Sequence, residues 1–209
     1  MSNTPRFEFF YDCSSPWTYF AFTRVIPLME RLGVDIHWRP ILVGGVFNAV
    51  NQQLYAARDN MFANKQRLGH YVKDMSDWAE LCDIAVGQPD VFPVNSVKAM
   101  RGAFFAQEQG LITAYSRAVF EAYWGHNRDI SQEEVLCELC GELGLDTERF
   151  LAWIASQSCK DALRANTEEL VARGGYGSPT MFINGDDMYF GNDRLPLIEH
   201  RLSQLLTNA

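Results

Sequence analysis

The sequence predicts an α/β fold in which strands and helices at the two ends of the chain are separated by a large α-helical insertion. Short apolar and aromatic runs typical of strands occur only before about residue 40 and after about residue 180. Between roughly residues 55 and 166 the segments are long and amphipathic, and no clear strand pattern is present. Near the C-terminus, Asn184-Gly185 separates two short apolar runs, which is a strong signal for a β-hairpin.

The first 40 residues predict a strand, a helix and a second strand. Residues 6–11 are a run of strand-forming, mostly aromatic residues. Ser15 is a favoured N-cap and Pro16 suits the first helical position, so a helix should begin there. It should end at Gly33, although Pro27 could kink it or end it early. A strand at residues 34–39 would complete a unit of the size of a right-handed βαβ motif.

The middle of the chain is predicted to be helical throughout. Its helices are separated by glycine-containing breaks at residues 87–89, 110, 125 and 144. Residues 129–131, followed by Glu133 and Glu134, are typical of a helix N-terminus. The expected helices span residues 60–81, 96–109, 111–124, 132–143 and 147–156.

The last third returns to mixed structure. We expect a helix at residues 159–173, a loop at 174–177, strands at 180–183 and 188–190, and a final helix at 193–206. The order of elements is that of a thioredoxin fold interrupted by a helical insertion. On this interpretation residues 1–45 and 160–209 form a thioredoxin-like domain, and residues 46–159 form the insertion domain.

The composition excludes several classes of protein. With 209 residues, 47% apolar and 21% charged, the chain is neither disordered nor collagen-like. A net charge of −8 opposes binding to nucleic acids and to anionic membranes. No segment approaches the roughly 18 apolar residues of a membrane span, and no secretory signal pattern is present. Five scattered cysteines do not resemble a secreted disulfide framework, so we expect a reduced, cytoplasmic protein.

The junction between the first strand and the first helix carries the most informative residues. Ser15-Pro16-Trp17-Thr18 stands where thioredoxin-fold oxidoreductases carry Cys-x-x-Cys, and both cysteines are absent. A helix N-terminus stabilises an anion, and a serine hydroxyl there can donate a hydrogen bond to a bound thiolate and lower its pKa. The protein would then take its sulfur from a ligand. The alternative is that Ser15 is only a helix cap.

Two motifs near the C-terminus complete the candidate site. Ser178-Pro179 enters a strand at a turn, and a cis bond would turn the backbone of Ser178 toward Ser15, where it could pair with a peptide ligand. A trans proline at a strand edge is the alternative. Asn192 and Asp193 open the last helix. They either cap it or belong to a subsite in which helix amides hold an α-carboxylate and Asp193 faces an ammonium group.

These motifs recur together in a known family. The chain resembles the 2-hydroxychromene-2-carboxylate isomerases of the kappa-class glutathione transferase group, in the DsbA-like branch of the thioredoxin superfamily. The resemblance covers residues 7 to about 205. Its most specific parts are Tyr11-Asp12 with Ser15-Pro16, Val91-Phe92-Pro93, Tyr123-Trp124-Gly125, residues 177–182 and residues 191–195.

The resemblance implies that glutathione is a cofactor that is not consumed. It places Ser15 on the sulfur of glutathione. It places Ser178, before a cis Pro179, on the cysteinyl backbone. It places Asn192 and Asp193 on the γ-glutamyl end.

The resemblance also implies a reaction. The thiolate adds to the chromene substrate, the ring opens, a bond rotates, and elimination yields trans-o-hydroxybenzylidenepyruvate with glutathione regenerated. In relatives a basic residue after the second strand assists, and Lys65 is the best match, followed by Arg67. Relatives are commonly dimers, so the expected partners are a second copy of the chain and an aromatic carboxylate, with no nucleic acid and no membrane.

Three other functions remain open. A kappa-like glutathione S-transferase would use the same site. A thiol-disulfide oxidoreductase needs a reactive cysteine at the helix start, and the nearby Cys13 lacks a resolving partner at the required spacing. A non-catalytic binding module would keep the fold without the chemistry.

Two further groups of residues each have a structural and a functional interpretation. Cys137 and Cys140 have the spacing of a zinc or redox pair, but no second pair follows, so we expect no metal site. The large aromatic residues either wall an aromatic substrate site or fill the core. These residues are Trp17, Phe47, Trp78, Phe92 and Trp124.

Overall fold

The computed structural model describes residues 4–50, 52–53 and 63–208, which include a four-stranded sheet in the order β2-β1-β3-β4. Strand β1 (Phe7–Tyr11) pairs in parallel with β2 (Ile36–Pro40) and antiparallel with β3 (Thr180–Ile183). Strand β4 (Asp187–Phe190) pairs antiparallel with β3 through the turn at Asn184-Gly185. The predicted βαβ unit and hairpin are therefore confirmed, and the sheet is that of a thioredoxin fold.

Helix α1 (Pro16–Leu32) follows the capping signals in the sequence. Ser15 has an extended backbone, and its side chain caps the helix, as predicted. Gly33 ends the helix in the left-handed conformation, with φ 65°, and its N–H donates to the carbonyls of Glu30 and Met29. Pro27 lies inside the helix and does not end it.

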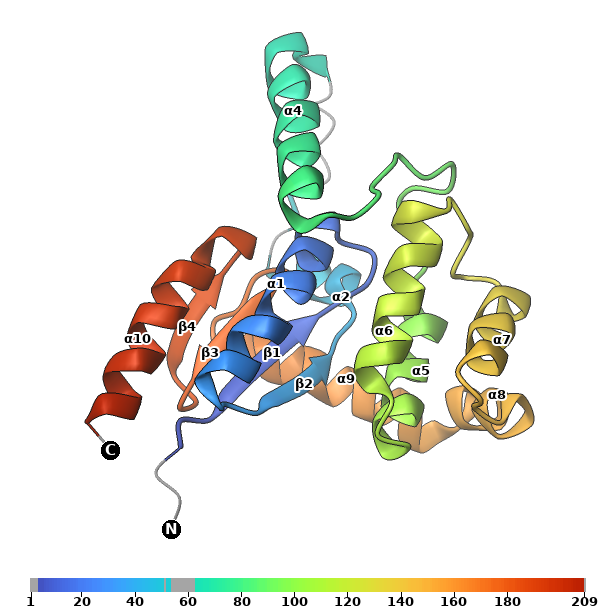
Figure 1. The fold of residues 1–209 in the computed structure, drawn as a ribbon. Helices are drawn as coiled ribbons and strands as arrows, with labels where there is room; N and C mark the ends of the chain where they lie inside the picture. The colour runs from blue at the N-terminus through green and yellow to red at the C-terminus, as the bar shows by residue number, and fades with distance from the viewer. Residues whose placement is uncertain (1–3, 51, 54–62, 209) are drawn as a thin grey trace.

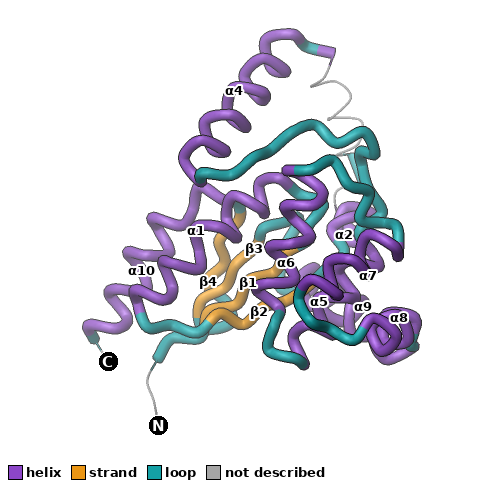
Figure 2. Tube along the Cα trace, turned by 45° about the vertical axis from the view of Figure 1, so that its right-hand side comes forward, coloured by secondary structure: helices purple, strands orange, loops and turns teal. Residues whose placement is uncertain are grey.

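Each face of the sheet is covered by its own helices (Figures 1 and 2). Residues alternate between the two faces of a strand, so Phe9 of β1 lies in the main core with Val25 of α1 and Ile198 of α10 (Leu195–Thr207). Phe10 points the other way, to a smaller core with Val46 of α2 (Val43–Val50) and Leu170 of α9 (Gln157–Ala172). The short helix η2 (Asn192–Arg194) precedes α10.

The middle of the chain is helical, as predicted. Its helices are α4 (Lys65–Cys82), α5 (Val97–Glu108), α6 (Ile112–Phe120), α7 (Glu133–Glu142) and α8 (Thr147–Ala155). The predicted start of the first of them, residue 60, lies outside the described residues. The predicted helix at residues 111–124 is two elements, because α6 gives way to a π-helical turn, η1 (Glu121–Gly125). None of the helices in the described ranges is long and apolar enough to cross a bilayer.

Two helices have features that the sequence pattern does not indicate. Helix α2 was not predicted, because two of its eight residues are glycines, which disfavour helix formation. It forms where Val46 is buried against the sheet. Helix α4 extends away from the rest of the molecule (Figure 1), and none of its residues is buried.

The division into domains remains a prediction. Helix α2 lies across the proposed boundary at residues 45/46, and α9 lies across the boundary at 159/160. One cluster of buried side chains contains both Phe7 of β1 and Phe150 of α8. The two proposed units therefore share a continuous core.

Candidate functional site

Ser15 lies at the start of α1, immediately beyond the end of β1. Its Oγ accepts a hydrogen bond from the backbone N–H of Thr18 at 3.3 Å, which is the expected capping contact. The hydroxyl proton points toward the carbonyl of Ser178, but that contact is long, at 3.4 Å. Ser15 is only partly buried. Its hydroxyl therefore caps the helix as an acceptor and can still donate to a ligand atom at the helix N-terminus.

Ser178 is held against this turn by buried hydrogen bonds. The peptide bond between Ser178 and Pro179 is cis. The Oγ of Ser178 accepts the backbone N–H of Asp12 at 3.0 Å and lies 2.7 Å from the Oγ1 of Thr18. The structure therefore brings together Ser15 and Ser178, which are far apart in the sequence.

Asp12 anchors the turn that carries Ser15. Its carboxylate is fully buried and accepts the N–H of Ser14 at 2.9 Å. The other oxygen accepts the N–H of Val43, at the start of α2, at 2.8 Å and the hydroxyl of Ser96, at the start of α5, at 3.0 Å. Burial raises the pKa of the Asp12 carboxyl, and these hydrogen bonds lower it only in part. One carboxylate thus fastens the Ser15 turn to two other helices.

A cavity of about 410 Å³ opens beside these residues. It is lined by Trp17 of α1, Asp74 and Trp78 of α4, Ser178, Pro179, Phe190, Gly191, Asn192 and Asp193. Four of the residues expected to bind a ligand, Ser178, Pro179, Asn192 and Asp193, therefore line one cavity. Ser15 contacts one of them, Ser178, through its hydroxyl. The volume lies in the range of small-molecule sites.

Asn192 places a buried amide at this cavity. The residue is 5% exposed, and its Nδ2 is buried with no hydrogen-bond partner among the described residues. A buried amide donor without a partner is costly unless a ligand or water satisfies it. Asn192 does not occupy an N-cap position, since Gly191 precedes η2 and Arg194 precedes α10. The ligand-binding alternative is therefore favoured over the capping alternative for this residue.

Asp193 is exposed at the mouth of the cavity and forms an ion pair with Arg194. The turn before it requires glycine, because Gly191 has φ 103° and a Cβ there would lie 2.8 Å from the Oδ1 of Asp193. The N–H of Gly191 donates to the carbonyl of Pro179 at 3.1 Å, which ties this turn to the cis-proline loop.

Asp74 was not identified from the sequence. It lies one helical turn before Trp78, so the two side chains share a face of α4. Trp17 and Trp78 line the cavity, as one of the two interpretations of the aromatic residues predicted. Phe92 and Trp124 instead pack on each other, and the indole N–H of Trp124 donates to the carbonyl of Cys13.

Lys65 lies apart from the other candidate residues. It is the first residue of α4 and is exposed, and Arg67 is exposed on the same turn. Nine residues separate Lys65 from Asp74, which corresponds to about 13 Å along a helix axis. Neither Lys65 nor Arg67 lines the cavity.

Cys13 is not placed to act as a redox thiol. Its side chain is 2% exposed, and burial raises the pKa of its thiol well above the usual value. Burial likewise raises the pKa of Cys140 to about 12. Within the described part of the chain, no three His, Cys, Asp or Glu side chains are grouped so that they could hold a metal ion. A sulfur at the start of α1 would therefore have to belong to a ligand.

The fold and this site define a class of protein. A thioredoxin-type sheet carries a cis proline opposite the first turn of α1, and the position of the usual cysteine is taken by serine. Residues 6–203 match the family model described as a DSBA-like thioredoxin domain. The chain belongs to the DsbA-like thioredoxin family.

Particular relatives narrow this class. The chain is 30% identical to a 2-hydroxychromene-2-carboxylate isomerase of Pseudomonas putida, over 95% of this chain and 94% of that protein. It is 25% identical to glutathione S-transferase kappa 1 of Rattus norvegicus, over 98% of this chain and 94% of that protein. A solved structure of a 2-hydroxychromene-2-carboxylate isomerase superposes with a TM-score of 0.82 at 27% identity, covering 97% of this chain and 96% of that one. These likenesses support an isomerase, and the resemblance expected from the sequence motifs is confirmed.

Proposed function

We propose that this protein is a glutathione-dependent isomerase that converts 2-hydroxychromene-2-carboxylate, or a similar aromatic carboxylate, to trans-o-hydroxybenzylidenepyruvate. The observation that carries the proposal is the position of Ser15. Its hydroxyl lies at a helix N-terminus, next to a cis-proline loop and an open cavity, and the nearby Cys13 is buried. This arrangement suits a thiol that enters with a ligand.

The residues in and beside the cavity offer groups for the cysteinyl and γ-glutamyl parts of glutathione. Ser15 and the first turn of α1 would hold the sulfur, because both favour the thiolate form. Ser178 and Pro179 would pair with the cysteinyl backbone. When bound, glutathione supplies a thiolate nucleophile that is recovered after each turnover.

The γ-glutamyl end carries an ammonium and a carboxylate, and the cavity offers a group for each. The unpartnered Nδ2 of Asn192 can donate to the carboxylate. Asp193, with Asp74 across the cavity, provides negative charge for the ammonium. Trp17 of α1 and Trp78 of α4 add apolar surface to the cavity wall.

A calorimetric titration with reduced glutathione tests the proposal first. Saturable binding that weakens in Asp193→Ala would place the peptide in this cavity. Product formation from the chromene carboxylate, with the glutathione concentration unchanged, would then establish the isomerase. No binding at millimolar glutathione would discard both the cofactor and the reaction.

A kappa-like glutathione S-transferase is the second candidate, because the chain is also similar over nearly its whole length to kappa-class enzymes. The two activities differ in whether glutathione is consumed. A transferase consumes glutathione when it is given an electrophile such as a nitroaryl chloride, whereas the isomerase returns it. A thiol-disulfide oxidoreductase is disfavoured by the burial of Cys13 and by the raised pKa of its thiol.

The proposal includes two expectations about the state of the protein. The five cysteines are unpaired in the structure, which is consistent with a reducing, cytoplasmic location. A homodimer is expected by analogy with relatives. Light scattering of the purified chain would decide its oligomeric state, with a mass near twice 23.8 kDa as the expected result.

A further inference from the structure

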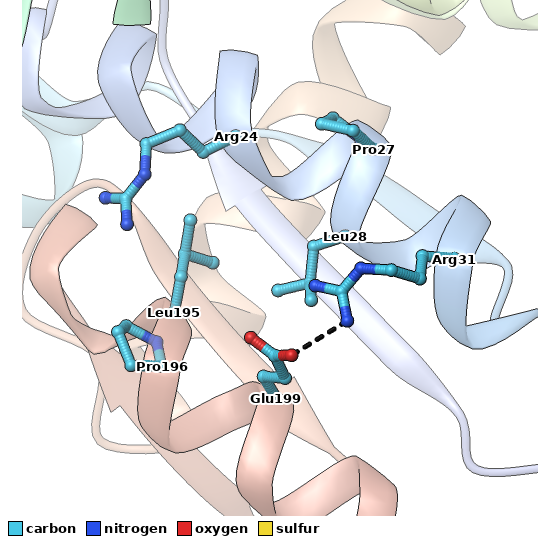
Figure 3. Close-up of a pocket in the computed structure, with 7 residues that line it drawn as sticks. All are labelled: Arg24, Pro27, Leu28, Arg31, Leu195, Pro196 and Glu199. Carbon is cyan, nitrogen blue, oxygen red and sulfur yellow. Dashed lines mark hydrogen bonds and ion pairs between the residues drawn. The ribbon is translucent and has the colours of Figure 1, made fainter. Parts of the chain in front are cut away.

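A groove of about 290 Å³ lies between α1 and α10 (Figure 3). Its walls carry two arginines from the same face of α1, Arg24 and Arg31, which are seven residues apart. Arg31 is 59% exposed and pairs with Glu199 of α10 at 2.8 Å, so its contacts stay within the groove. Arg24 is partly buried and makes its contacts outside the groove.

Arg24 contacts two residues that line the 410 Å³ cavity, Asn192 and Trp78. Its Nη1 donates to the backbone carbonyl of Asn192 at 3.2 Å. Its guanidinium lies over the ring of Trp78, with Cζ 4.7 Å from the centroid. Asn192 and Trp78 both line the cavity, whereas Arg24 does not. One side chain therefore fixes the position of the 190–194 turn relative to α4.

Helix α4 is held to the body of the protein through contacts with α1. None of its residues is buried, and it projects away from the sheet (Figure 1). Besides the Arg24 contact, ring contacts of Trp17 with Tyr71 and of Phe20 with Trp78, and a long bond from the Cys82 thiol to the Phe20 carbonyl, join α4 to α1. Most of the stability of a helix in a protein comes from packing against its neighbours, so the position of α4 depends on such contacts.

We infer that Arg24 is a positioning residue that sets the specificity for the γ-glutamyl end of glutathione. It holds Trp78, with Asp74 one turn away, at a fixed distance from Asn192 and Asp193, without touching the ligand. This inference rests on the proposed function, because it assumes that the cavity takes the γ-glutamyl group. The sulfur end of the site, at Ser15 and Ser178, has no contact with Arg24 and should be unaffected.

Calorimetry with glutathione tests the inference, with Arg31→Ala as the matched control from the same helix and groove. In Arg24→Ala the Kd should rise about tenfold, while the pKa of the bound thiol, followed by thiolate absorbance, stays at the wild-type value. Arg24→Lys keeps the charge but loses the planar guanidinium, so it should restore at most part of the affinity. In Arg31→Ala the Kd should change less than twofold.

Three results would overturn the inference. They are an unchanged Kd in Arg24→Ala, an equal rise in Arg31→Ala, or a shift in the pKa of the bound thiol as large as that in Ser15→Ala. If Arg24→Ala does not fold, the comparison of Arg24→Lys with Arg31→Ala decides the question in the same way.

Hydrogen exchange of the ligand-free protein separates this inference from the proposed function. The amides of α4 should exchange faster in Arg24→Ala than in Arg31→Ala, while those of β1 stay protected in both. If the wild-type protein does not bind glutathione, the proposed function fails, and this exchange experiment still tests the contact. Equal exchange of α4 in the two variants would contradict the positioning role whether or not glutathione binds.

Discussion

The two ends of strand β1 each bury a carboxylate, and they compensate its charge in different ways. Glu8, near the start of the strand, is 2% exposed and pairs with Arg6, Arg39 and Arg173. Asp12, just after its end, is 0% exposed. In the described ranges Asp12 forms no ion pair, and it accepts hydrogen bonds from backbone amides and from hydroxyl groups.

This difference changes the pKa in opposite directions. Burial raises the pKa of Glu8, but the hydrogen bond and charge of Arg173, with the other two arginines, outweigh it and hold the pKa below 4.5. Burial keeps the pKa of Asp12 above 3.8 in spite of its neutral donors. Three arginines therefore balance the charge at the Glu8 end of the strand. At the Asp12 end, the groups that face the carboxylate in the described part of the chain are neutral hydrogen-bond donors, and a bound thiolate would depend on the same kind of group.

The largest expected effect is at Glu8. Replacing it by glutamine leaves three arginines around a neutral side chain, and losing one partner of a buried ion pair costs about 3 kcal/mol. Glu8→Gln should lower the free energy of unfolding in urea by about that amount. Glu169→Gln is the control, because Glu169 pairs with Arg39 and Arg173 but is 40% exposed, and it should cost less than about 1 kcal/mol. Equal losses of unfolding free energy in the two variants would contradict the expected difference between a buried and an exposed carboxylate.

Asp12→Asn should cost about 2 kcal/mol of unfolding free energy. The carboxylate accepts a backbone N–H on each oxygen, from Ser14 and Val43, so an amide group must turn its NH₂ toward one of these donors. Ser96→Ala is the control, since it removes one hydroxyl donor and keeps both amide bonds, and it should cost about 1 kcal/mol. A smaller loss in Asp12→Asn than in Ser96→Ala would show that the backbone bonds contribute little.

Ser15→Ala should raise the pKa of the thiol of bound glutathione by about one unit, because one hydrogen bond to the charged form is lost. The fold should be unchanged, since Pro16 still begins the helix. The measurement is a titration of thiolate absorbance in the complex. Ser14→Ala, in the same turn, is the control. An identical titration in wild type and Ser15→Ala would rule out the proposed role of Ser15.

The pH dependence should differ in sign between the two ends of β1. Glu8 stabilises the fold above its ordinary pKa of 4.5, and this contribution is lost as the pH falls through its lowered pKa. Asp12 contributes stability below its ordinary pKa of 3.8, and this is lost as the pH rises through its raised pKa. Urea unfolding from pH 7 to 3 should therefore show a shrinking gap between wild type and Glu8→Gln and a growing gap between wild type and Asp12→Asn. Parallel trends would contradict the assigned directions.

The smallest effect is expected at Lys65, which the family resemblance suggested for glutathione binding. Lys65 is exposed at the far end of α4 and does not line the cavity. Lys65→Ala should change the Kd of glutathione less than twofold in calorimetry, as should Lys73→Ala elsewhere on the same helix. A tenfold rise for Lys65→Ala alone would restore it to the binding site.

Local signals in the sequence were sufficient for most of the fold and for part of the site. Ser15 and Gly33 mark the ends of α1, since capping depends on residues that are neighbours in the chain. Asn184-Gly185 marks the hairpin for the same reason. Helix α2 gave no such signal, because its burial against Phe10 and Leu170 outweighs its poor helix propensity.

The sequence by itself determined the order of strands and helices, the cap at Ser15, and the set Ser178, Asn192 and Asp193, because each depends on short-range spacing or on a motif. Only the tertiary structure decided that Asp74 and Trp78 face these residues, that Lys65 does not, and that Cys13 is buried. It also decided that Arg24 joins α4 to the turn at Asn192. These facts depend on contacts between segments far apart in the chain, and on the burial that follows from them, which local spacing does not encode.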